Sequence, residues 1–142
     1  MKNIRHIGLV VSNLDKALTF YRDLLGLKIQ GTTSEEGDFI STIISIDNVK
    51  LKTIKLSADD NSTRIELIEL LSKIPTNNTE QLSTKGFTHI ALTVSNLDEL
   101  YTKLQNKGIE FTCEPKVSPN GKLKITFCKD FEGNFLELTQ EL

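Results

Sequence analysis

A chain of 142 residues and 15.9 kDa is long enough for one compact domain, or for two small half-domains that share a core. Hydrophobic residues make up 38% and charged residues 25% of the sequence, so the composition excludes a disordered or fibrous chain. The 17 basic and 19 acidic residues are spread along the chain without a Lys/Arg cluster, which argues against nucleic acid and membrane surfaces as partners.

The sequence also bears on where the protein works. No apolar run approaches the roughly 20 residues of a membrane-spanning helix, and the apolar stretch near the N-terminus is short and has no small-residue cleavage site. We therefore expect a cytoplasmic protein. Cys113 and Cys128 form no CxxC spacing, and two cysteines are too few for a secreted disulfide scaffold. We expect both to be reduced, structural thiols.

The N-terminal segment has the pattern of a strand followed by a helix. Residues 5–11 alternate so that a strand would place His6 on one face and the large apolar side chains on the other. Asn13 is a favourable helix N-cap, apolar residues then recur at helical spacing, and Gly26 is a typical helix stop.

The remainder of the first half predicts mainly strands. Residues 27–33 are typical of a strand, and the polar stretch 34–38 predicts a break after it. Residues 39–46 fit a short helix as well as a strand. Residues 51–57 and 63–71 then predict the two strands of a hairpin.

The second half follows a polar segment that has no apolar period. Its first strand precedes a helix that ends before Gly108, and Asn120-Gly121 predicts a hairpin turn. Further strands are expected near residues 109–113, 122–129 and 134–140. The predicted division is a first module at residues 1–71, a linker at 72–85 and a second module at 86–142.

An internal repeat relates the two halves. Residues 88–98 nearly repeat residues 5–15, and His6 and His89 occupy the same position of the repeat, 83 residues apart. Chance similarity between short apolar segments would rarely give so many matches in register. We therefore predict an α+β fold built from two copies of one strand, helix and strand unit.

Each copy ends on a strand that carries a glutamate between apolar neighbours, Glu66 in the first and Glu137 in the second, 71 residues apart. Alternation would direct each glutamate to the same face as the histidine of its unit. Solvent-facing glutamates and structural histidines are the common alternative. If the repeats pair, however, His6, Glu66, His89 and Glu137 would offer two imidazoles and two carboxylates to a divalent transition metal.

These residues resemble the vicinal oxygen chelate superfamily, which includes glyoxalase I, methylmalonyl-CoA epimerase and extradiol dioxygenases. The resemblance rests on motifs at residues 6–11, 20–27, 65–67, 86–91 and 130–138, which together span nearly the whole chain. It implies two paired βαβββ modules whose sheets curl around a metal cleft. His6, Glu66, His89 and Glu137 fall on the four ligand positions of glyoxalase I, and the metal would be nickel, cobalt, zinc or manganese.

The filled ligand set makes the resemblance to glyoxalase I stronger than that to other members. Extradiol dioxygenases and fosfomycin-resistance thiol transferases have no ligand at the position of Glu66, epimerases tend to carry glutamine there, and antibiotic-sequestering members generally lack the ligands. One departure concerns the substrate, because Val10 stands where many glyoxalase I sequences have an arginine that helps to hold glutathione. Other cations that could bind an anionic substrate group, although each is more commonly a solvated surface residue, are Arg64, Lys122 and Lys124.

From this resemblance we expect a metal-dependent lyase or isomerase of the lactoylglutathione lyase type, acting on a small molecule through an enediolate formed by proton abstraction. Glu137 is the expected catalytic base and Glu66 the second candidate. The alternatives are an epimerase of acyl-CoA thioesters and a metal-free protein that binds a small molecule such as an antibiotic. Because two sheets, each covered by one helix, leave strand edges unpaired, we also expect a homodimer. The ligands of one site would then come from one chain or from two.

Overall fold

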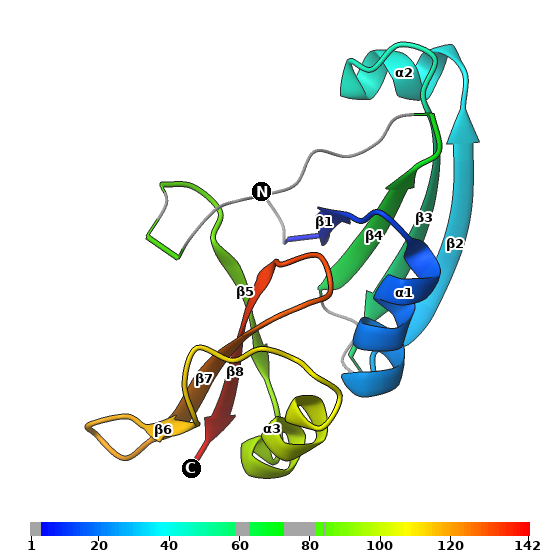
Figure 1. Cartoon of the computed structure of the whole chain (residues 1–142). Helices are drawn as coiled ribbons and strands as arrows, with labels where there is room; N and C mark the ends of the chain where they lie inside the picture. The colour runs from blue at the N-terminus through cyan, green and yellow to red at the C-terminus, as the bar shows by residue number, and fades with distance from the viewer. Residues whose placement is uncertain (1–3, 59–62, 73–81, 84) are drawn as a thin grey trace. The chain divides into compact units, whose positions relative to one another are not determined.

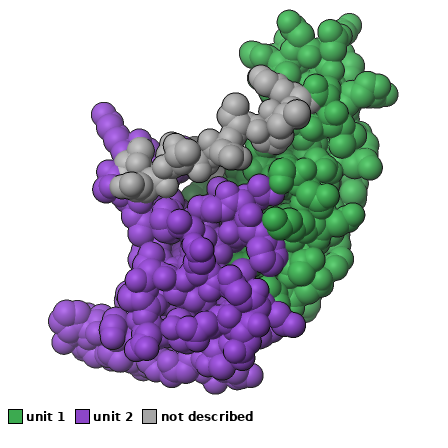
Figure 2. All heavy atoms as spheres, in the orientation of Figure 1, with its two compact units in different colours: residues 1–76 green, residues 77–142 purple. Residues whose placement is uncertain are grey.

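Each half of the chain folds into a four-stranded mixed sheet with its own helical segment (Figure 1). The computed structural model describes residues 4–58, 63–72, 82–83 and 85–142. The chain divides into two units, residues 1–76 and 77–142 (Figure 2). The predicted module boundaries stay a prediction, since most of the expected linker at 72–85 lies outside the described residues.

Unit 1 has the strand order β1-β4-β3-β2, in which β1 and β4 are parallel and the other neighbours are antiparallel. In chain order its elements are β1 (His6–Val10), α1 (Leu14–Leu18), η1 (Thr19–Leu24), β2 (Lys28–Glu36), α2 (Asp38–Ile44), β3 (Lys50–Ser57) and β4 (Arg64–Leu70). The hairpin predicted at 51–57 and 63–71 is confirmed by β3 and β4.

The first helix begins and ends where the sequence predicts. The Asn13 side chain accepts a hydrogen bond of 2.8 Å from the backbone N–H of Lys16, and Gly26 adopts a φ of 80° after the last turn. From Thr19 onward the backbone follows the wider π-helical pattern of η1. The consecutive side chains Phe20 and Tyr21 are both almost fully buried in this stretch.

The polar break predicted at 34–38 is wrong for its first three residues. Strand β2 continues to Glu36, because its backbone pairs with β3 as far as Lys50, and the Lys50 Nζ lies 2.8 Å from the Glu36 Oε2. Edge pairing therefore outweighs the low strand propensity of these polar residues. The ambiguous segment 39–46 falls largely on helix α2.

Unit 2 repeats this arrangement with the strand order β5-β8-β7-β6, in which β5 and β8 are parallel. Its elements are β5 (His89–Thr93), α3 (Leu97–Gln105), β6 (Lys116–Val117), β7 (Leu123–Lys129) and β8 (Phe135–Glu141). The prediction of two βαβββ modules is thus confirmed.

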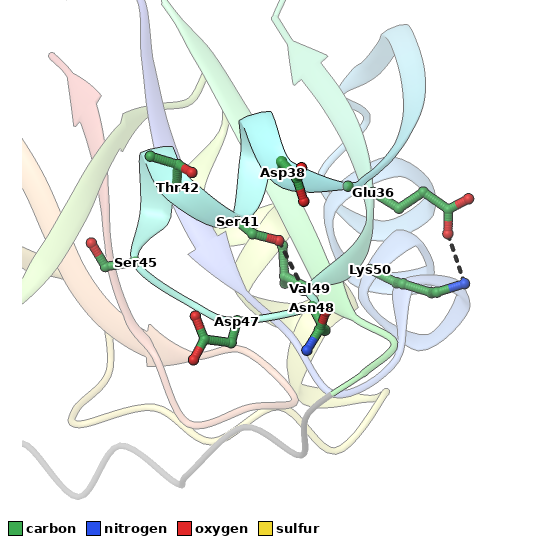
Figure 3. A pocket seen from close by; sticks show the side chains of 10 residues that line it. Glu36, Asp38, Ser41, Thr42, Ser45, Asp47, Asn48, Val49 and Lys50 are labelled. Carbon is green, nitrogen blue, oxygen red and sulfur yellow. Dashed lines mark hydrogen bonds and ion pairs between the residues drawn. The ribbon is translucent and has the colours of Figure 1, made fainter.

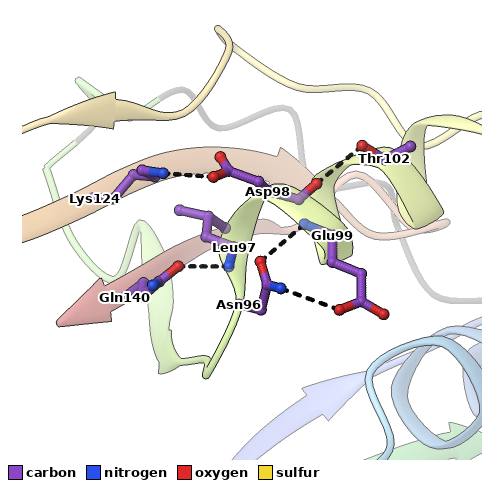
Figure 4. Close-up of polar contacts among 7 residues, drawn as sticks. All are labelled: Asn96, Leu97, Asp98, Glu99, Thr102, Lys124 and Gln140. Carbon is purple, nitrogen blue, oxygen red and sulfur yellow. Dashed lines mark hydrogen bonds and ion pairs between the residues drawn. The ribbon is translucent and has the colours of Figure 1, made fainter. Parts of the chain in front are cut away.

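Helix α3 is fixed at its first turn by polar contacts (Figure 4). Asn96 caps it by accepting a 3.2 Å hydrogen bond from the backbone N–H of Glu99, and the Gln140 side-chain oxygen of β8 accepts a 2.7 Å bond from the N–H of Leu97. Two otherwise unpaired helix N–H groups are thereby satisfied. Among the described residues, no helix combines the length and apolar character needed to cross a bilayer.

The strand predicted near residues 109–113 is not formed. In this stretch only Phe111 makes an isolated bridge, to Cys128, and the short strand β6 follows it instead. Ile109 turns into the core after α3 and is 6% exposed. Pro115 has no backbone N–H to donate, so a regular ladder cannot run through it.

Each sheet has one face that packs on its helical segment and one that carries the polar repeat residues. The buried apolar side chains of unit 1 include Val11, Leu14, Ala17, Leu18, Phe20, Tyr21, Leu24, Ile54, Leu56, Ile65 and Leu67, and those of unit 2 include Leu97, Leu104, Ile109, Leu136 and Leu138. Cys128 belongs to the second set, and burial raises the pKa of its thiol to about 12. Cys113 is exposed, so it is a free thiol but not a core one.

Candidate functional site

The first pair of predicted site residues lies on neighbouring parallel strands of unit 1. His6 is in register with Arg64 and Gly8 with Glu66, so His6 and Glu66 are diagonal neighbours on one sheet face. The His6 Nε2 lies 3.2 Å from the Glu66 Oε2, with the side chains 36% and 12% exposed. The helix-facing positions between them are apolar, which fixes the imidazole and the carboxylate on the opposite face.

Unit 2 reproduces this pair. His89 is in register with Phe135 and Ala91 with Glu137, so the diagonal relation is the same as in unit 1. The His89 Nε2 lies 3.3 Å from the Glu137 Oε2, and these side chains are 34% and 22% exposed. The repeat seen in the sequence is therefore also a repeat of side-chain geometry.

The spacing of the donor atoms fits a metal ligand pair. Two ligand atoms that each lie about 2.1 Å from an ion are about 3.0 Å apart at a right angle and about 3.4 Å apart at a tetrahedral angle. The separations of 3.2 and 3.3 Å fall between these values. A neutral imidazole and a carboxylate are also ligand types that divalent transition ions accept.

The structure places the four predicted ligands in two His–Glu pairs, one in each unit. His6 and Glu66 meet in unit 1, and His89 and Glu137 meet in unit 2. Among the described residues no group of three or more His, Cys, Asp and Glu side chains is placed to hold a metal ion. A single centre with all four ligands therefore stays a prediction.

The two carboxylates have different partners. The Lys55 Nζ lies 3.2 Å from the Glu66 Oε1, and Lys55 is the residue directly opposite Glu66 on β3. The residue opposite Glu137 is Phe127, and the Glu137 Oε1 instead accepts a 2.9 Å hydrogen bond from the Thr139 hydroxyl. Glu66 is thus held by a full positive charge, and Glu137 by a neutral hydroxyl.

The second imidazole is also oriented by its surroundings. The His89 Nδ1 lies 2.9 Å from the Thr88 hydroxyl, and the ring meets Phe127 edge to face with centroids 5.1 Å apart. With the proton on Nδ1, His89 donates to the Thr88 hydroxyl, and the lone pair on Nε2 can be donated to a metal ion. Such an orienting bond on the far nitrogen is usual for histidines that bind metals.

Sequence reasoning did not find Lys55, Thr88, Phe127 or Thr139. Thr88 adjoins a repeat histidine, so its position was a usable signal, whereas Lys55 and Phe127 become neighbours of the glutamates only through hairpin register.

Of the cations expected to bind an anion, Lys124 does not face the site. Its Nζ donates a 2.5 Å hydrogen bond to the Asp98 carboxylate at the start of α3, on the helix side of the sheet (Figure 4). Lys122 precedes β7 and lies in the turn, where it is exposed. Arg64 does share the face of Glu66, since it lies two residues earlier on the same strand.

A separate hollow of about 820 Å³ lies beside α2 (Figure 3). It is lined by the end of β2, by α2 and by the turn into β3, where the Ser41 hydroxyl accepts a 3.2 Å bond from the backbone N–H of Val49. None of the four predicted ligands lines it. The hollow is therefore not part of either His–Glu pair.

Comparison with known proteins gives the same fold and names two activities among relatives. Residues 3–138 match the family model described as Glyoxalase/Bleomycin resistance protein/Dioxygenase superfamily. A lactoylglutathione lyase of Schizosaccharomyces pombe is 29% identical over 150 residues, covering 97% of this chain and 47% of that protein. The chain thus spans about half the length of this relative.

Two further proteins extend the comparison. The mitochondrial methylmalonyl-CoA epimerase of Mus musculus is 24% identical over 140 residues, covering 96% of this chain and 72% of that protein. The crystal structure of a glyoxalase family protein from Bacillus cereus superposes with a TM-score of 0.92 at 23% identity, covering 100% of this chain and 95% of that one. This last likeness shows the fold.

Proposed function

The chain belongs to the Glyoxalase/Bleomycin resistance protein/Dioxygenase superfamily, and on that premise we propose that it is a metal-dependent lyase or isomerase of glyoxalase I type. Its substrate would be a small molecule with vicinal oxygens. The proposal is supported chiefly by the His–Glu pair that recurs in both units, with donor atoms 3.2 and 3.3 Å apart. The His and Glu side chains of both pairs are only partly buried, whereas their strand neighbours Ile65, Leu67, Leu136 and Leu138 are buried on the opposite face of each sheet.

His6, Glu66, His89 and Glu137 would hold the metal ion. When bound, a divalent ion supplies Lewis-acid polarisation of a substrate carbonyl. Nickel, cobalt, zinc and manganese all accept nitrogen and carboxylate oxygen ligands, so the ligand set does not select among them.

Glu137 is the residue we assign to proton transfer. Its carboxylate would accept a proton from the carbon beside the substrate carbonyl and return it to the neighbouring carbon, which balances an isomerisation. Glu137 is more exposed than Glu66 and is bound by the Thr139 hydroxyl, whereas Glu66 is bound by the Lys55 ammonium. An ion pair with a full cation restrains a carboxylate more strongly than one neutral hydroxyl does. Glu66 is therefore more firmly held in position and is better suited to remain a metal ligand. Glu137 is less restrained and is better suited to move as the base.

An epimerase of acyl-CoA thioesters is the second candidate, supported by the mouse relative of that name. It would use the same proton abstraction beside a carbonyl. Against it, epimerases tend to carry glutamine at the position of Glu66. A metal-free binding protein is the third candidate, and four intact ligand side chains argue against it.

Proton exchange in deuterated water tests these alternatives. Protein purified without chelators is loaded with each metal and incubated with hemithioacetals of 2-oxoaldehydes or with acyl-CoA thioesters. We expect deuterium in the product at the carbon that was the carbonyl carbon of the hemithioacetal, because the proton taken up by Glu137 can exchange with solvent before it returns to that carbon. This incorporation should be lost in Glu137→Gln. Glu69→Gln is the matched control, because Glu69 lies on β4 with the opposite parity to Glu66. Exchange with acyl-CoA alone would select the epimerase, and absence of both metal uptake and exchange would contradict enzymatic function.

A further inference from the structure

The two units carry the same His–Glu pair but differ in the side chains beside it. Lys55 is opposite Glu66 in unit 1, and the equivalent position opposite Glu137 in unit 2 is Phe127. Arg64, in register with His6, likewise corresponds to Phe135, in register with His89. These matches follow from the strand registers.

This difference shows that cations are not needed to support a His–Glu pair. Unit 2 keeps its imidazole and carboxylate 3.3 Å apart with phenylalanines at both flanking positions. Lys55 and Arg64 therefore call for a separate explanation. As diagonal neighbours on adjacent strands, these two long side chains can reach one common group.

The charges beside the first pair are not balanced. Arg64 is half-buried and makes no ion pair or hydrogen bond within the part of the chain that the structure describes. Among the described residues Lys55 pairs with Glu66 alone, so two cations stand beside one carboxylate at this position. A partly desolvated guanidinium without a partner is unfavourable, and an anion that bonds to it would remove that cost.

We propose that Lys55 and Arg64 form an anion-binding subsite that takes a carboxylate group of the substrate. A carboxylate would bring a second negative charge to the two cations beside Glu66, and its planar oxygens match the parallel N–H donors of a guanidinium. The subsite rests on the proposed function in one respect: it assumes that the substrate lies on the face of His6 and Glu66. It narrows the substrate class to small oxo or hydroxy compounds that carry a carboxylate.

Direct binding to the metal-free protein tests the subsite. Isotope-labelled protein is titrated with pyruvate, with the uncharged analogue 2,3-butanedione and with inorganic phosphate, and the backbone amide signals of Lys55 and Arg64 are followed by NMR. We expect saturable shifts with pyruvate, weaker binding of phosphate and none of butanedione. Arg64→Gln should weaken pyruvate binding about tenfold or more, as expected for a lost charge-assisted bond. Arg64→Lys should restore part of the affinity, and Lys55→Met should also weaken binding.

Lys52→Gln is the matched control, since Lys52 is an exposed lysine of β3 on the other face of the sheet. Each variant is used only if its amide spectrum shows the native fold. Equal pyruvate affinity in wild type and Arg64→Gln, binding of butanedione as tight as that of pyruvate, or tighter binding of phosphate would each overturn the proposal.

The two proposals can fail separately. Pyruvate binding that depends on Arg64, without any proton exchange, would uphold the subsite and contradict the proposed function. The converse outcome is proton exchange that does not depend on the subsite. If exchange is equally fast for substrates with and without a carboxylate, and if the substrate KM in Arg64→Gln equals that of wild type, the subsite is contradicted and the proposed function is upheld.

Discussion

Replacing Thr139 by valine would remove the hydroxyl that holds the candidate catalytic base. The Thr139 Oγ1 donates a 2.9 Å hydrogen bond to the Glu137 Oε1. The strand position accepts an apolar β-branched residue, because Ile68 occupies it in unit 1. Thr139→Val should therefore fold normally, and its effect should fall on the site.

The structure sets the size of the two expected effects. Partners that orient metal ligands typically account for 10- to 100-fold in metal affinity, and we expect a loss of about tenfold, because His89 still lies beside Glu137. The Glu137 side chain is 22% exposed, so water can replace the lost bond. The free energy of unfolding should therefore fall by no more than about 1 kcal/mol.

Competition against a coloured chelator measures the metal affinity, and denaturant unfolding measures the stability. Thr102→Val is the control, since the Thr102 hydroxyl donates a 2.9 Å bond to a backbone carbonyl of α3 away from the His–Glu pair. A metal affinity of Thr139→Val within twofold of wild type would refute the assignment of Thr139 as the residue that positions Glu137.

Other predictions follow from the site and from the thiols. His6→Ala and His89→Ala should each lose most of the bound metal and keep the fold, because both side chains lie away from the core; stoichiometric metal in either variant, measured by elemental analysis, would contradict the four-ligand centre. Glu137→Gln should lower turnover more than metal content, and equal losses would leave it a ligand only. Sedimentation at micromolar concentration should give a homodimer, and a fully active monomer would count against it; activity regained on mixing His6→Ala with His89→Ala chains would mean that each site draws on two chains. At about pH 8 a thiol reagent should label exposed Cys113, whereas Cys128, whose pKa burial raises to about 12, should react only after unfolding; rapid labelling of both would argue against the buried position.

Local signals in the sequence predicted the helix that follows the first strand of each unit, but they left the segment of α2 open between helix and strand. Asn13 was expected as a cap, and its side chain accepts the backbone hydrogen bond of an N-cap. Asn96 accepts the equivalent bond at the start of α3. Gly26 and Gly108 were expected as stops, and both adopt a positive φ. Capping depends on residues three or four positions apart, so the information that decides it lies within the segment itself.

Strand boundaries were predicted less well because partners distant in the sequence decide them. The polar residues before Glu36 remain in β2 because their backbone groups pair with those of β3. Residues 109–113 do not form a strand, although their composition permits one. Propensity describes a residue by itself, whereas a strand requires an uninterrupted partner.

The sequence by itself determined the repeat, the α+β class and the equivalence of His6 with His89 and of Glu66 with Glu137. These follow from composition and periodicity, which need no knowledge of pairing. Only the tertiary structure decided that each histidine stands within about 3.3 Å of its glutamate and that Lys55 meets Glu66. The physical reason is strand register: a shift of one residue would turn every one of these side chains to the other face, and register is fixed by backbone hydrogen bonds and core packing between segments far apart in the chain.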